Sequence, residues 1–84
     1  MTKNQISIYD NGGKSLDRIT IVFNKFSNYT NGQLLYDAIS SSENGSGIFS
    51  WTTAMKGRHL GKKITYNDLS DELKRRIDSV LEEM

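Results

Sequence analysis

Two short stretches of the sequence contain the glycine, lysine and hydroxyl residues that hold phosphates in nucleotide-binding loops. Gly13-Lys14-Ser15 matches the end of the motif G-x-x-x-x-G-K-[ST], but the first glycine of that motif would fall at Ile8. The residues after Ser15 have the pattern of a strand, whereas the motif requires the N terminus of a helix. The stretch from Gly57 to Lys63 is too short for the motif and lacks its Ser or Thr. Both stretches are therefore predicted to be turns.

The candidates for metal binding or acid–base catalysis are the single histidine and three aspartates beside predicted turns. No acidic residues surround His59 in the sequence, so a metal site is not expected there. Asp10, Asp17 and Asp37 have a structural explanation, because aspartates beside turns accept hydrogen bonds from their own backbone. The chain has no cysteine, and no serine–histidine pair for covalent catalysis is identifiable. We therefore expect a non-enzymatic protein without a metal or a cofactor.

A basic stretch bordered by aromatic residues is the most informative local feature. Between Ala54 and Tyr66 there are four lysines or arginines and no acid, and Phe49 and Trp51 precede them. Basic groups with interleaved aromatics suit single-stranded nucleic acid, because bases stack on rings while cations hold phosphates. The same pattern is typical of a solvated loop beside core aromatics, and of a surface that meets an acidic protein. The sequence leaves these three interpretations open.

The composition limits the class of protein. A chain of 84 residues predicts a single domain that spans 1–84. The net charge of +1, from 11 basic and 10 acidic residues, argues against a dedicated duplex-DNA binder. No apolar run follows the first lysine, and no segment approaches the roughly 18 apolar residues of a membrane span. We therefore expect no signal peptide, no membrane partner and a cytoplasmic location.

The periodicity of apolar residues predicts the elements that position these candidates. Strands are predicted over residues 5–10, 18–24, 33–39 and 63–66, with a short edge strand over 48–51. The first two alternate apolar and polar residues around Asn11-Gly12-Gly13, which predicts an antiparallel hairpin. Residues 24–32 are polar and punctuated, and no strand is predicted there. Residues 33–39 favour a third strand, but Thr30-x-x-Gln33 resembles a helix capping box, so a helix stays open as the alternative.

An amphipathic helix is predicted over residues 70–83. Ser70 is its expected N-cap, and three i,i+4 ion pairs are expected along it. These pairs are Asp71/Arg75, Glu72/Arg76 and Lys74/Asp78. The apolar face of the helix consists of Leu69, Leu73, Ile77, Val80, Leu81 and Met84. The predicted fold class is α+β, a small antiparallel sheet of three to four strands with this C-terminal amphipathic helix packed on one face.

Two stretches of the chain resemble a family of short uncharacterised bacterial and phage proteins. Tyr9-Asp10-Asn11-Gly12-Gly13, followed by Asp17-Arg18-Ile19-Thr20, is similar to the Y-D-N-G-G…D-R-x-T start of that family. His59-Leu60-Gly61-Lys62-Lys63-Ile64, followed by Asp68-Leu69, resembles its C-terminal signature H-L-G-K-x-I…D-L. Ser42-Glu43-Asn44 is similar to its S-E-N loop, but this chain lacks the prolines that usually follow. The resemblance implies a small accessory protein of phage or mobile elements, and it brings no activity with it.

Our leading hypothesis is a small non-enzymatic protein-binding module that modulates a host component. The alternatives are a single-stranded nucleic-acid-binding protein that uses residues 49–66, and a structural, self-assembling protein or homo-oligomer. The expected partner-binding residues are Phe49, Trp51, Lys56, Arg58, Lys62 and Lys63.

Overall fold

Branched apolar residues at every second position build the inner face of the first hairpin. β1 (Ile6–Asp10) and β2 (Ile19–Thr30) pair antiparallel, with Ile8 opposite Ile21. Both side chains are buried on the same face of the sheet, together with Phe23. This hairpin confirms the prediction from the alternating residues.

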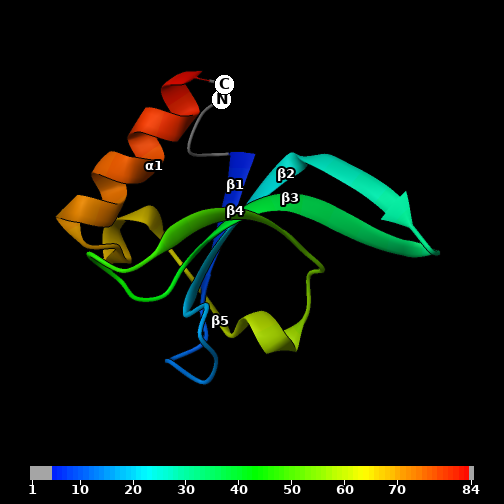
Figure 1. The fold of residues 1–84 in the computed structure, drawn as a ribbon, viewed down its shortest axis with the longest axis horizontal. Helices are drawn as coiled ribbons and strands as arrows, with labels where there is room; N and C mark the ends of the chain where they lie inside the picture. Colours follow the sequence, from blue (N-terminus) through cyan, green and yellow to red (C-terminus); the bar gives the residue numbers. More distant parts are fainter. Residues whose placement is uncertain (1–4, 84) are drawn as a thin grey trace.

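The computed structural model describes residues 5–83 as a five-stranded antiparallel sheet with one helix across it (Figure 1). The strands lie in the order β4-β3-β2-β1-β5, so β4 and β5 form opposite edges. The elements after the first hairpin are β3 (Gln33–Ser41), β4 (Phe49–Ala54), the 3-10 turn η2 (Arg58–Leu60), β5 (Lys62–Ile64), the 3-10 turn η3 (Tyr66–Asp68) and α1 (Asp71–Glu83). The α+β class is confirmed, with five strands where three to four were predicted.

The main core lies between the sheet and α1. Leu73, Ile77 and Leu81 are buried against the inner face of the strands, as their spacing predicts. The hydroxyl of Ser70 accepts a hydrogen bond from the N–H of Leu73 at 3.1 Å, which confirms the predicted N-cap. Met84, placed on the same face by the pattern, lies outside the described residues.

The ion pairs predicted along α1 form only in part. Among the described residues, Glu72 and Arg76 make the i,i+4 pair at 3.0 Å. Asp78 instead accepts a hydrogen bond from the hydroxyl of Tyr66 at 2.9 Å, and Lys74 lies over the Tyr66 ring. Tyr66 of η3 therefore takes the place that the pattern assigns to Lys74 as the partner of Asp78.

A second, smaller core covers part of the other face of the sheet. It consists of Val22, Ala38, Ala54 and Leu60, and Leu60 comes from η2 rather than from a strand. Because the described residues cover this face with little more than one 3-10 turn, the buried groups beside it include the small polar residues Ser7, Thr20 and Ser40. The sheet thus has one well-covered face and one thinly covered face.

The largest difference from the predicted elements is a long β2–β3 hairpin. No strand is predicted between residues 24 and 33, but β2 continues to Thr30. The turn is Asn31-Gly32, with φ of 52° and 79°, the left-handed pair that favours Asn-Gly in two-residue hairpin turns. The alternating residues of 33–39 form β3, so the helix alternative for them is wrong.

Smaller differences concern the last two strands. β4 extends the predicted edge strand 48–51 to Ala54, and β5 ends at Ile64, two residues before the predicted end at Tyr66. The early end has a local cause. The side chain of Asp68 accepts hydrogen bonds from the N–H and the hydroxyl of Thr65, which starts η3 and bends the chain away from the sheet.

Candidate interaction surfaces

The β1–β2 connection is built around the side chain of Asn11. Its Oδ1 accepts hydrogen bonds from the N–H groups of Gly13 at 2.8 Å and Lys14 at 3.1 Å. Its Nδ2 donates to the hydroxyl of Ser15 at 2.7 Å and to the carbonyl of Asp17 at 2.8 Å. The backbone N–H groups that a phosphate loop would offer are therefore already bonded. Gly13-Lys14-Ser15 is a turn, as its context predicts.

Asp10 closes the same connection with an ion pair. Its carboxylate accepts hydrogen bonds from Arg18 Nε at 3.0 Å, Arg18 Nη2 at 3.2 Å and the N–H of Gly12 at 2.7 Å. The Arg18 hydrogen bond is the main reason that the pKa of Asp10 lies below its usual value, although partial burial opposes the shift. Asp10 therefore stays ionised and is neutralised by Arg18.

Gly61 lets β5 approach this connection closely. Its φ is +92°, and a Cβ at this position would overlap the carbonyl oxygen of Asp10 and the Cα of Asn11. A residue with a side chain does not fit here without moving backbone atoms. The close approach places η2 and the start of β5 beside the β1–β2 connection.

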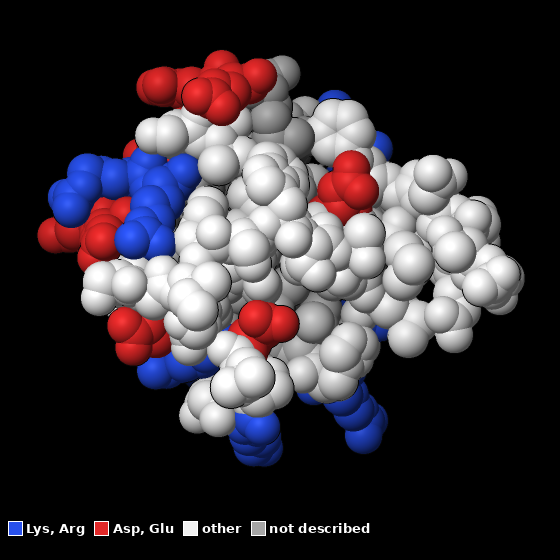
Figure 2. All heavy atoms as spheres, viewed as in Figure 1, with Lys and Arg blue, Asp and Glu red and all other residues white. Residues whose placement is uncertain are grey.

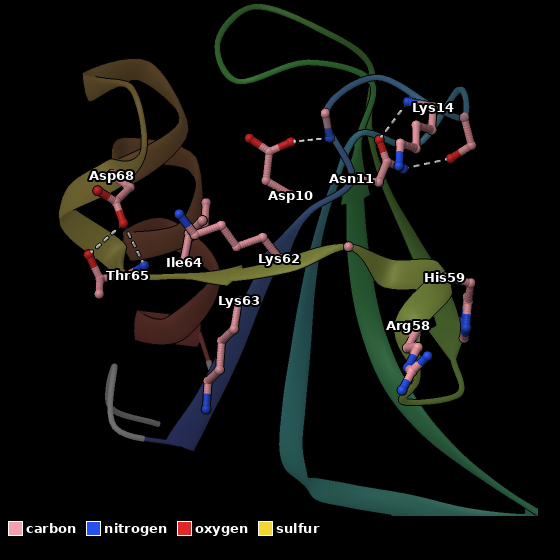
Figure 3. Close-up of a pocket in the computed structure, with 13 residues that line it drawn as sticks. Asp10, Asn11, Lys14, Arg58, His59, Lys62, Lys63, Ile64, Thr65 and Asp68 are labelled. Atoms are coloured by element: carbon pink, nitrogen blue, oxygen red, sulfur yellow. Dashed lines mark hydrogen bonds between the residues drawn. The ribbon is translucent and has the colours of Figure 1, made fainter.

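An open depression of about 870 Å³ lies where the two segments meet (Figure 3). Its basic side chains are Lys14 from the β1–β2 connection, Arg58 from η2, and Lys62 and Lys63 from β5. Figure 3 shows these side chains around the depression and pointing in different directions, with Lys62 on the side of Thr65. We call Lys14, Arg58 and Lys62 the basic rim.

The second carboxylate of the depression is also bonded within the protein. Asp68 accepts hydrogen bonds from the N–H of Thr65 at 2.8 Å and from its hydroxyl at 3.0 Å. The backbone hydrogen bond is the largest cause of the lowered pKa of Asp68, and the charge of Lys62 lowers it further. Nearby, burial and the hydrogen bond to Asp78 raise the pKa of the Tyr66 phenol.

The edge strand β4 presents a second candidate surface. Its six residues, Phe49–Ala54, carry no charge, and no strand among residues 5–83 pairs with its outer edge. Trp51 is 61% exposed although its ring stacks on buried Phe23, with centroids 5.6 Å apart. Ile48, just before the strand, is 76% exposed. An uncharged edge with large exposed apolar side chains is therefore open to another chain.

The β2–β3 hairpin extends this surface. Beyond Tyr36, which pairs with Ala54, β4 no longer accompanies β3, and the two-stranded hairpin projects away from α1 (Figure 1). We call residues 25–36 the arm. Phe26 and Tyr29 on the arm are 44% and 75% exposed. In Figure 2, the face over β4 and the arm has few charged side chains, whereas charges gather over α1 and along one end of the molecule.

The six residues predicted to bind a partner do not form one patch. Phe49 and Trp51 lie on β4, and Lys62 and Lys63 lie on β5 at the opposite edge, four strand spacings or roughly 19 Å away. Phe49 packs against the main core and lies under Arg76. The sequence places these groups close together, but the order of the strands separates them.

The remaining two predicted residues also differ in their surroundings. Lys56 Nζ donates to Asn24 Oδ1 at 2.8 Å and lies 4.6 Å from the centroid of the Tyr36 ring, so it is held against the sheet. Arg58 is exposed on η2, beside the depression. Arg58 therefore belongs with the lysines of β5, and Lys56 does not.

The stretch that resembles the S-E-N loop has a structural role. Asn44 donates to the carbonyl of Asp68 at 3.1 Å and accepts from the N–H of Ser70 at 2.7 Å. It thus fastens the β3–β4 loop to the start of α1. Residues far apart in sequence make these bonds, so no local pattern indicates them.

Comparisons with protein-family models, with curated proteins and with solved structures find no match for this chain. Within residues 5–83, no group of three or more His, Asp or Glu side chains is arranged to hold a metal ion. Over the same residues, no helix is both long and apolar enough to cross a membrane.

Proposed function

We propose that this chain is a small, non-enzymatic protein-binding module whose partner pairs with the open edge of β4. The observation that carries this proposal is the edge itself. Six consecutive uncharged residues without a proline form this edge, the middle four are exposed, and Trp51 is among them. Proteins usually protect such an edge with lysines, prolines or bulges, because it can pair with any extended chain.

The opposite edge of the sheet supports this choice of surface. β5 has three residues, and two of them are lysines. A short, charged strand is a common protection against unwanted pairing. Of the two edges, β4 alone combines length, lack of charge and exposed apolar groups.

Strand addition would use the backbone and one aromatic anchor. An extended segment of the partner would bond to the outward N–H and C=O groups of β4, while its side chains contact Trp51. The arm continues the surface past Ala54 and offers Phe26 as a second apolar contact. Because this surface is nearly uncharged, we propose a neutral, apolar segment as the ligand and expect binding that changes little with salt.

The resemblance to bacterial and phage accessory proteins supplies the proposed context. Accessory proteins of mobile elements act inside the host cell, so we propose a host protein as the partner and the host cytoplasm as the location.

A pull-down with two charge-adding variants tests the proposal. Thr53→Lys places a charge on exposed β4, and Ser79→Lys places the same charge on exposed α1. Tagged wild type and both variants are incubated with nuclease-treated host lysate. We expect one protein to be retained by wild type and by Ser79→Lys, and lost with Thr53→Lys.

Two results would contradict the proposal. Equal retention of the partner by both variants would exclude β4 as the binding edge. A Thr53-dependent dimer in light scattering, without any captured partner, would favour the self-assembling alternative.

A further inference from the structure

The basic rim consists of cations that make no close ion pair within the described residues, although the charge of Lys62 acts on Asp68. The side chains of Lys14, Arg58 and Lys62 are exposed, and none donates a hydrogen bond or joins an ion pair within residues 5–83. They come from three separate segments that Gly61 brings together. Three cations around one depression repel each other, so an anion that lies between them is favoured.

The acidic groups of the depression do not cancel this charge. Asp10 is bonded to Arg18, which supplies the neutralising charge. Asp68 is occupied by Thr65 and faces only Lys62 among the rim cations. Because Lys63 also lines the depression, the local balance stays positive although the whole chain carries only +1.

The donors that remain define the kind of anion. The N–H groups of Gly12, Gly13 and Lys14 are bonded to the side chains of Asp10 and Asn11, so no backbone cradle is left for a single phosphate. The cations stand on separate segments around an open depression (Figure 3). Spaced charges of this kind match a row of phosphates along a chain.

The lining offers little surface for base stacking. No Phe, Tyr or Trp lines the depression, where the His59 imidazole is the one ring among the described residues, and Trp51 lies at the opposite edge of the sheet. We propose that the basic rim binds the phosphate groups of an extended polyanion, either a single-stranded nucleic acid or an inorganic polyphosphate. The ligand is held by charge, and its bases are not read. This site is separate from the β4 edge and does not depend on the function proposed for it.

Fluorescence anisotropy with a labelled oligothymidylate of about twelve nucleotides tests the proposal directly. Three phosphate contacts predict a slope of log K against log salt near −2, so affinity should fall roughly 20-fold between about 50 and 200 mM salt. Arg58→Ser/Lys62→Ser should weaken binding at least tenfold. The control Lys25→Ser/Arg75→Ser removes the same two charges from the arm and α1, and should change affinity less than threefold. Both pairs of side chains are exposed, so thermal unfolding should match wild type.

Competitors then distinguish the source of the phosphates. If unlabelled polyphosphate displaces the oligonucleotide at equal phosphate concentration, the site accepts both polyanions. If polyphosphate does not displace the oligonucleotide, the ligand is nucleic acid. A glutamate peptide of equal charge that binds as tightly would overturn the phosphate assignment in favour of an acidic protein surface. Absence of oligonucleotide binding, or equal weakening by the control variant, would overturn the site itself.

Discussion

Replacing Gly61 by alanine tests whether the close approach of β5 to the β1–β2 connection holds the fold together. The new Cβ would overlap backbone atoms of Asp10 and Asn11 and lie 2.7 Å from the Asn11 nitrogen. These atoms cannot rotate away as a side chain would. The residue would also keep a φ of +92° and a ψ of −154°, a region that only glycine adopts readily.

The two effects set the size of the expected loss. Backbone strain of this kind costs about 1–3 kcal/mol, and forcing extra atoms into packed space costs about 1–3 kcal/mol more. We therefore expect Gly61→Ala to lower the free energy of unfolding by about 3 kcal/mol or more. For a chain of this size, such a loss lowers Tm by at least about 12 °C. The free energy of unfolding of a small domain is only a few kcal/mol, so part of the Gly61→Ala population should be unfolded at about 37 °C.

Gly45→Ala is the matched control for this substitution. No atom lies within 4 Å of a Cβ built at position 45, and the glycine has no left-handed φ. Its unfolding free energy should stay within about 0.5 kcal/mol of wild type. Urea unfolding followed by circular dichroism measures both variants. If Gly61→Ala were as stable as Gly45→Ala, the proposed contact between β5 and the β1–β2 connection would be wrong.

Three further substitutions test the core, a loop and an ion pair by the same assay. Leu73→Ala should cost about 2–5 kcal/mol, because the side chain is fully buried between α1 and the sheet. Asn44→Ala should cost about 1–3 kcal/mol, since the N–H of Ser70 loses its partner, and an unchanged urea midpoint would contradict this role. Asp10→Asn should cost roughly 1 kcal/mol near neutral pH, given the partly exposed Arg18. Because folding lowers the pKa of Asp10, that difference is present above the usual carboxyl pKa of about 4 and should vanish as the pH falls through the lower, folded value. A difference that persists in acid would exclude the ion pair as its source.

The elements that depend on local periodicity could be predicted from the sequence. The spacing of Leu73, Ile77 and Leu81 predicts α1, and the alternation in β1 and β2 predicts their hairpin. The β2 half of the arm was missed although Asn31-Gly32 is a strong hairpin signal, because residues 25–30 are mostly polar. Residues 27–30 form a strand by pairing with residues 33–36 across this turn, although they have no alternating apolar pattern.

The candidate sites depend on contacts that a local pattern does not contain. Trp51 and Lys62 are close in sequence, yet the strand order places them on opposite edges of the sheet. Conversely, Lys14 joins Arg58 and Lys62 because Gly61 packs against Asp10. The sequence thus predicted most of the residues of the basic rim, but it also combined them with aromatic residues of another surface.

Amide hydrogen exchange of β4, with and without the captured partner protein, tests strand addition most directly. An added strand bonds to the N–H groups that point outward, and these belong to alternate residues of an edge strand. We predict that alternate amides within Phe49–Ala54 exchange more slowly in the complex, while the amides of Lys62–Ile64 at the opposite edge keep their rates. A bound partner that leaves every β4 amide unchanged would contradict the β4 edge as the binding surface.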